Sequence, residues 1–125
     1  MLSDLQRAAL EQALKARRRR TAERIAALTR DFDAIVASSA ITPPDDEHDP
    51  DGATVAFERA QIAALLISAR AQLDDLDAAL DRLGGGVYGV CEGCAEPIAY
   101  ERLLARPATR SCVACLDAGP VRSSP

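Results

Sequence analysis

Four cysteines lie near the end of the 125-residue chain in two pairs of identical spacing. Cys91 and Cys94 form the first Cys-x-x-Cys pair, and Cys112 and Cys115 form the second after seventeen intervening residues. Two residues between thiolates allow a tight turn to direct both sulfurs at one ion, and a second such turn completes a tetrahedron. The spacing therefore predicts a zinc site with these four cysteines as ligands.

An iron–sulfur cluster and a pair of disulfides are the alternatives for these cysteines. Zinc fits better, because four thiolates form a closed, soft ligand set at a spacing less typical of iron–sulfur sites. The first ten residues, MLSDLQRAAL, lack the basic and then apolar arrangement of a secretory signal. We therefore expect a cytoplasmic protein, in which reducing conditions oppose disulfides.

The zinc is expected to be structural, because four protein ligands leave no position for an activated water. The single histidine, His48, is distant from the cysteines in the sequence, so we predict a protein that is not an enzyme. The module is too small to fold by burial alone, so metal binding must contribute folding energy. We assign it to residues 84–119 and expect 120–125 to form a disordered tail. Apolar residues between the cysteine pairs are expected to pack over the metal: Pro97, Ile98, Tyr100, Leu103 and Leu104.

The elements that precede the module are predicted to be two long helices. The first runs from about residue 3 to 37, with Ser3 as N-cap and Asp4 in its first turn. The second runs from about Thr54 to Leu83 and ends at three consecutive glycines. Both have apolar positions three and four residues apart, which is typical of a coiled-coil seam. In the first helix, with Arg18 as a weak position, these are Leu14, Thr21, Ile25, Leu28, Phe32 and Ile35. In the second they are Val55, Ile62, Leu66, Ala69, Leu73, Leu76, Leu80 and Leu83, interrupted by Arg59.

Neither helix has more than one apolar stripe, so we expect the two to pack together as an antiparallel hairpin. The predicted fold class is mainly α: a coiled-coil hairpin over residues 1–83, followed by the four-cysteine zinc-finger module. Roughly thirty residues of helix span about 45 Å. No apolar stretch approaches the ~18 residues of a membrane span, and we expect a monomer.

Charge is strongly segmented along the chain. Residues 1–30 contain eight basic and three acidic side chains, whereas residues 31–54 contain seven acids and no Lys or Arg. The formal net charge of −4 argues weakly against a general nucleic-acid binder. The run Arg17 to Arg20 is interpreted as a solvated helix segment, the alternatives being a DNA or nuclear-localisation arm and a contact with an acidic protein.

The two predicted helices are joined by an acidic tip loop over residues 38–53. Three prolines remove backbone donors there, and five acids fall within seven residues. A solvated loop that only separates the helices is one interpretation. The loop is, however, longer than such a connection requires, and its acids are clustered, which favours a function for it.

The chain from about Ile25 to Cys115 resembles the DksA/TraR family of bacterial transcription regulators, in its predicted coiled-coil hairpin as well as in its cysteine motif. The similarity is carried by Tyr88-Gly89-Val90-Cys91, Cys94, Ile98, Arg102-Leu103, Ala105-Arg106-Pro107 and the pair Cys112 and Cys115. It implies a regulator that binds RNA polymerase directly and inserts the tip of its coiled coil into the secondary channel. The resemblance also implies an effect on promoter complexes, often together with the nucleotide ppGpp, without specific DNA binding.

This resemblance assigns candidate contact residues in the tip. The family's Asp-x-x-Asp-x-Ala motif falls on His48, Asp51 and Ala53, so a histidine replaces the first acid. Glu47 and Asp49 flank this histidine and preserve the negative charge. An exposed histidine without a role and a pH-sensitive contact are both compatible with His48.

The family's ppGpp-contacting residues transfer only in part. Arg106 matches one of these basic positions, while Asp75 and Leu116 occupy two others. An acid facing a pyrophosphate weakens binding, so we expect ppGpp to bind weakly or not at all.

Ala95 also stands where many zinc knuckles place a glycine with positive φ.

Two other functions compete with polymerase regulation. A DNA-binding zinc finger would use the Arg17 to Arg20 run together with Arg102, Arg106 and Arg110 on phosphates. A thiol redox protein would use the Cys-x-x-Cys pairs, and stable stoichiometric zinc would exclude it.

Overall fold

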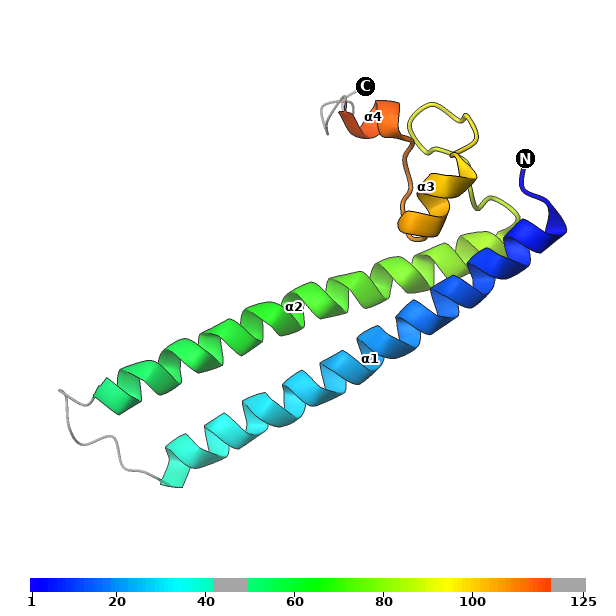
Figure 1. Ribbon diagram of the computed structural model, residues 1–125. Coiled ribbons are helices and arrows are strands. Elements are labelled where there is room, and N and C mark those ends of the chain that lie inside the picture. Colours follow the sequence, from blue (N-terminus) through cyan, green and yellow to red (C-terminus); the bar gives the residue numbers. More distant parts are fainter. Residues whose placement is uncertain (42–49, 118–125) are drawn as a thin grey trace. The chain divides into compact units, whose positions relative to one another are not determined.

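The computed structural model describes residues 1–41 and 50–117 and contains four helices in these ranges (Figure 1). They are α1 (Asp4–Ile41), α2 (Pro50–Gly85), α3 (Tyr100–Ala105) and α4 (Val113–Asp117). Within the described ranges the only strand-like pairing is an isolated antiparallel bridge between Val90 and Pro97. The mainly helical class is therefore confirmed. The tail 120–125 lies outside the described residues.

Helix α1 begins where the sequence predicts. The Gln6 backbone N–H donates to Ser3 Oγ over 3.0 Å, and the Ser3 N–H donates to Gln6 Oε1 over 3.0 Å. This reciprocal pair is a capping box, and it confirms Ser3 as N-cap. The helix continues to Ile41, four residues past the predicted end at Ala37, because the next residue that opposes helix in the sequence is Pro43.

Helix α2 begins at Pro50, four residues before the predicted start at Thr54. Proline suits the first position of a helix, since its fixed φ is helical and its missing N–H is not needed there. The two helices thus take in residues 38–41 and 50–53 of the predicted tip loop. Residues 42–49 lie outside the described part of the chain.

Helix α2 ends two residues later than predicted, at Gly85. Gly86 has φ of +81°, which a residue with a side chain adopts only at a cost. The Val87 N–H donates to Arg82 O over 3.0 Å, and the Gly86 N–H points to Leu83 O over 3.4 Å. These two bonds form a Schellman motif, which satisfies the last carbonyls of the helix and turns the chain toward the first cysteine pair.

The chain divides into two compact units, each containing part of α1 and part of α2. We call residues 19–73 the hairpin unit. In it α1 and α2 run side by side in opposite directions (Figure 1), with Leu66 and Ala69 buried along the seam. The other predicted apolar seam residues of this unit are half-buried: Thr21, Ile25, Leu28, Phe32, Ile35, Val55, Ile62 and Leu73.

We call residues 1–18 together with 74–125 the cysteine unit. Its core contains Leu10, Leu14, Leu76, Ala79, Leu83, Tyr88, Cys91, Ile98 and Leu103. Leu10 extends the predicted seam by one step toward the N-terminus. Ala79 lies off the seam but is completely buried, since it clusters with residues of the cysteine module. None of the described helices is long and apolar enough to cross a membrane.

Candidate metal centre

The four cysteine sulfurs converge on one point in the cysteine unit. All four Sγ atoms lie within 4.8 Å of one another, and those of Cys94 and Cys112 are 3.8 Å apart. A tetrahedron with zinc–sulfur bonds of about 2.3 Å has edges of about 3.8 Å. The donor set and its spacing therefore fit zinc, which when bound cross-links the two cysteine pairs and offsets part of the negative charge of their thiolates.

Backbone N–H groups stabilise a negatively charged sulfur at this site. The N–H groups of Gly93 and Cys112 each donate to Cys91 Sγ over 3.3 Å. The bond from Cys112 contributes most to lowering the pKa of the Cys91 thiol to about 6, with smaller contributions from Cys94 and Gly93. Because one bond reaches from the second cysteine pair to the first, both pairs polarise the same sulfur.

The pKa values of Cys94 and Cys115 are raised, so these two thiols resist ionisation without a cation. Side-chain hydrogen bonds with the other three cysteines, Cys91 first, raise the pKa of Cys115 to about 12. Four thiolates so close together repel one another, so a divalent cation is required to hold all four ionised.

Tight turns bring the first pair into position. A Cβ added at Gly93 would lie 2.9 Å from Cys115 Sγ, so glycine is needed there for the second pair to approach. Ala95 has φ of +64°, and its N–H donates to Cys91 O over 2.8 Å. The expected positive-φ position is therefore confirmed, and an alanine occupies it at an energetic cost.

Only some of the apolar residues between the two cysteine pairs are buried as predicted. Ile98 and Leu103 are buried, whereas Leu104 is 44% exposed and Pro97 is also exposed. The prediction for Leu104 was wrong because α3 is a short helix, in which adjacent residues point in different directions. Tyr88, which is buried, donates its hydroxyl to Pro107 O over 2.8 Å, and burial raises its pKa to about 12.

Two arginines form hydrogen bonds and an ion pair that connect the residues just before the second cysteine pair to the rest of the unit. The Arg102 Nε donates to Ser111 O over 2.9 Å, and its Nη2 donates to Thr109 Oγ1 over 3.2 Å. Arg110 forms an exposed ion pair with Glu92 over 3.3 Å. The sequence contained no signal for these contacts, because they depend on how the loop between the pairs folds back.

The arginine run in α1 is divided between the two units. In the cysteine unit, Arg17 Nη2 donates to Ala105 O over 3.2 Å, and Arg18 forms an ion pair with Asp77. Hydrogen bonding and charge attraction from Asp77 raise the pKa of Arg18. Arg19 and Arg20 are exposed in the hairpin unit. Two members of the run thus have internal structural contacts.

Arg82, in the last turn of α2, has an unusual environment. Its Nη1 and Nη2 atoms are buried without a hydrogen-bond partner among the described residues. Burial, followed by repulsion from Arg110, lowers its pKa. The favourable position of a cation at a helix C-terminus offsets part of this cost.

The candidate residues outside the cysteines are not gathered into a second site in the described residues. Glu47, His48 and Asp49 lie outside these residues. Asp51 and Ala53 belong to α2, where Ala53 is exposed. Arg106 is exposed at the end of α3.

Comparison with known proteins identifies the cysteine module. Residues 86–118 match the family model of the prokaryotic dksA/traR C4-type zinc finger. An uncharacterized protein of Aquifex aeolicus is 45% identical over 47 residues, which cover 38% of this chain and 32% of that protein. The protein YteA of Bacillus subtilis, also uncharacterized, is 39% identical over 62 residues, which cover 50% of this chain and 26% of YteA. The matched regions thus span about a third or less of these relatives.

A solved structure matches nearly the whole chain. It is that of the transcription factor DksA2 from Pseudomonas aeruginosa, with a TM-score of 0.80 and 28% sequence identity. The match covers 96% of this chain and 87% of DksA2. Residues 86–118 thus match the dksA/traR C4-type zinc finger, and the chain resembles the transcription factor DksA2 over nearly its whole length.

Proposed function

We propose that this protein regulates transcription by binding RNA polymerase directly and inserting its acidic tip into the secondary channel. The observation that carries the proposal is the similarity to the transcription factor DksA2 over 96% of the chain. The tip residues expected to act near the catalytic centre are Glu47, His48, Asp49, Asp51 and Ala53. Zinc is structural, and the protein is not an enzyme.

Charge provides the physical basis for an effect of the tip. Residues 31–54 contain seven acids and no basic residue. Carboxylates brought close to a catalytic magnesium site compete with its own carboxylate ligands or change its electrostatic environment. A negative tip also avoids binding to DNA phosphates, consistent with regulation without specific DNA contacts.

The contacts of the arginines argue against the alternative of a DNA-binding zinc finger. Arg17, Arg18, Arg102 and Arg110 all bond to groups within the protein. Each must give up or share such a bond to bind a phosphate. Weak affinity for bare DNA is the expected result, measured by fluorescence anisotropy at several salt concentrations.

In vitro transcription with purified polymerase tests the proposal. We expect Asp51→Asn to abolish the effect on promoter complexes while polymerase affinity remains within about twofold, because the change removes charge with little change in shape. Asp49→Asn compares a neighbouring acid in the same tip. A variant with normal regulation would show that the charge of Asp51 is not part of the mechanism. Adding ppGpp is expected to change the result little, because Asp75 and Leu116 replace basic residues.

A further inference from the structure

Arg17 belongs to the arginine run of α1, but its side chain contacts the zinc-finger module. Its Nη2 donates to the carbonyl oxygen of Ala105 over 3.2 Å, across 88 positions of the sequence. Ala105 is the last residue of α3, and the last carbonyls of a helix have no partner within the helix. Both residues lie in the cysteine unit. The hydrogen bond therefore joins α1 to the end of α3.

Other polar contacts of α3 lead to the second cysteine pair. Arg102, within α3, donates from Nε to Ser111 O over 2.9 Å and from Nη2 to Thr109 Oγ1 over 3.2 Å. The Thr109 hydroxyl in turn donates to Ser111 O over 3.1 Å. Ser111 directly precedes Cys112, whose N–H donates to Cys91 Sγ over 3.3 Å. These bonds hold the backbone just before a metal ligand, so a displacement of α3 must move or break them.

Apolar burial connects α3 to α1 as well. Leu103 of α3 is completely buried, and so are Leu10 and Leu14 of α1. All three belong to one core cluster that also includes the metal ligand Cys91. Helix α3 is thus connected to α1 by shared burial and by the bond from Arg17, and to the second cysteine pair by the bonds of Arg102.

We propose that Arg17 is a positioning residue of the metal centre, which slows the loss of zinc by holding the end of α3. Zinc leaves a closed four-cysteine site only after a local opening detaches a sulfur. Contacts that hold α3 and the loop before Cys112 lower the population of this open state, so the loss of a contact speeds release. The inference gives a role to one member of the arginine run and does not depend on the proposed action of the tip.

The rate of zinc release from the full chain tests this role. Zinc-loaded protein is mixed with a colorimetric chelator at concentrations high enough that opening of the site limits the rate. Arg17→Met removes the donor but keeps an unbranched side chain that favours helix. We expect release about twofold to fivefold faster than in the wild type, because one exposed hydrogen bond contributes modestly. Arg17→Lys can still donate to Ala105 O and should have a rate between the two.

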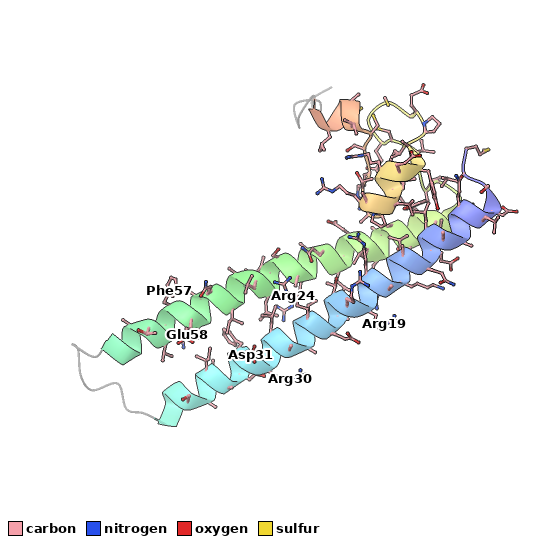
Figure 2. The ribbon with its side chains drawn as sticks, in the orientation of Figure 1. Arg19, Arg24, Arg30, Asp31, Phe57 and Glu58 are labelled. Atoms are coloured by element: carbon pink, nitrogen blue, oxygen red, sulfur yellow. The ribbon has the colours of Figure 1, made fainter. Side chains whose placement is uncertain are left out.

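Two control variants remove a positive charge and leave the bond from Arg17 intact. Arg106→Met alters the exposed neighbour of Ala105, and among the described residues the Arg106 side chain has no hydrogen bond or ion pair. Arg19→Met alters the same run of α1 in the hairpin unit, where Figure 2 shows the Arg19 side chain on the side of α1 that faces away from α2. Both controls are expected to release zinc at the wild-type rate.

Arg102→Met breaks the next connection between α3 and the second cysteine pair. We expect release to be about tenfold faster, since residues that support metal ligands change metal affinity by about 10–100-fold. If Arg17 acts through α3, it has no further effect once this connection is lost. The double variant with Arg17→Met should therefore release zinc no faster than Arg102→Met alone, which a double-mutant cycle measures.

Three results would overturn the proposal. One is a wild-type rate for Arg17→Met, and a second is an equal acceleration by Arg106→Met, which would assign the effect to charge alone. The third is a double variant in which the two accelerations multiply, because Arg17 would then act independently of α3. The Arg17 variants and both controls change exposed side chains only, so the test does not require Arg102→Met to fold. The assay contains no polymerase, so its outcome is separate from that of the proposed function.

Discussion

The cysteine unit and the hairpin unit share the same two helices but differ in how they bury them. Nine of the eleven buried apolar residues in the described chain belong to the cysteine unit, and only Leu66 and Ala69 belong to the hairpin unit. In the cysteine unit, residues of the cysteine module join the helices in one core. In the hairpin unit each helix has one covered face, so most seam residues stay half-buried. A two-helix ribbon thus leaves long faces free for a partner.

Polar contacts follow the same division. Among the described residues, bonds between segments far apart in the sequence join Arg7 to Leu83 O, Arg17 to Ala105 O and Tyr88 to Pro107 O within the cysteine unit. Such bonds oppose independent movement of the segments they join. The comparison indicates that the cysteine unit is stabilised by contacts of many kinds, whereas the hairpin unit depends on the seam.

Removal of zinc is expected to have the largest effect on the difference between the two units. Structural zinc contributes about 10–16 kcal/mol in zinc-finger peptides, so chelation or Cys112→Ser is expected to abolish the tertiary structure of the cysteine module. Both tyrosines, Tyr88 and Tyr100, lie in the cysteine unit, and the chain has no tryptophan. Near-UV circular dichroism near 280 nm therefore reports on this unit alone, and we expect the signal to be lost.

Ser111→Ala is the matched control for Cys112→Ser. It alters the neighbouring side chain, while the Ser111 carbonyl that accepts from Arg102 remains. Zinc content measured after gel filtration should stay at one ion per chain for this control. A near-UV signal that persists after zinc is removed would show that the apolar core alone holds the unit together.

Truncation of one leucine in each unit measures the difference in burial directly. Leu10 is completely buried in the cysteine unit, whereas Leu28 is half-buried in the hairpin unit. We expect Leu10→Ala to lower the free energy of unfolding by about 2–5 kcal/mol and Leu28→Ala by about 1–2 kcal/mol, in proportion to the area lost. Urea unfolding followed by far-UV circular dichroism gives both values. Equal losses would mean that the seam is as tightly packed as the core.

Periodicity and cysteine spacing predicted most of the fold. The steps of three and four residues identified both helices and the seam, because burial against one partner leaves a regular apolar line. The two Cys-x-x-Cys pairs identified the metal ligands, since two such pairs at this separation suit a single tetrahedral ion. The capping residue Ser3 followed from the known preference for a side-chain acceptor at that position.

Features that depend on tertiary contacts could not be predicted from local sequence patterns. Ala79 is completely buried. Because alanine is common on both exposed and buried helix faces, its residue type did not predict this burial. The bonds of Arg102 depend on a loop that folds back across seven and nine residues. A second line of residues in α2 has the same spacing as the seam, and only its exposure in the structure distinguishes it: Ala53, Phe57, Ala60, Ala64, Ile67 and Ala71.

The backbone of Ala95, in the turn of the first cysteine pair, gives the prediction with the smallest expected effect. Its positive φ is a local strain within the cysteine unit. Ala95 is exposed with φ of +64°, and the left-handed region costs an L-residue about 1–2 kcal/mol. Glycine removes this strain but has about 0.5–1 kcal/mol more chain entropy to lose on folding. We expect Ala95→Gly to stabilise the cysteine unit by about 0.5–1 kcal/mol and to raise its melting temperature by several degrees, measured by near-UV circular dichroism. Ala9 is also exposed in the cysteine unit but lies inside α1 with a negative φ, so Ala9→Gly relieves no strain and should lower the melting temperature. Changes of the same sign in both variants would show that the positive φ at Ala95 does not limit stability.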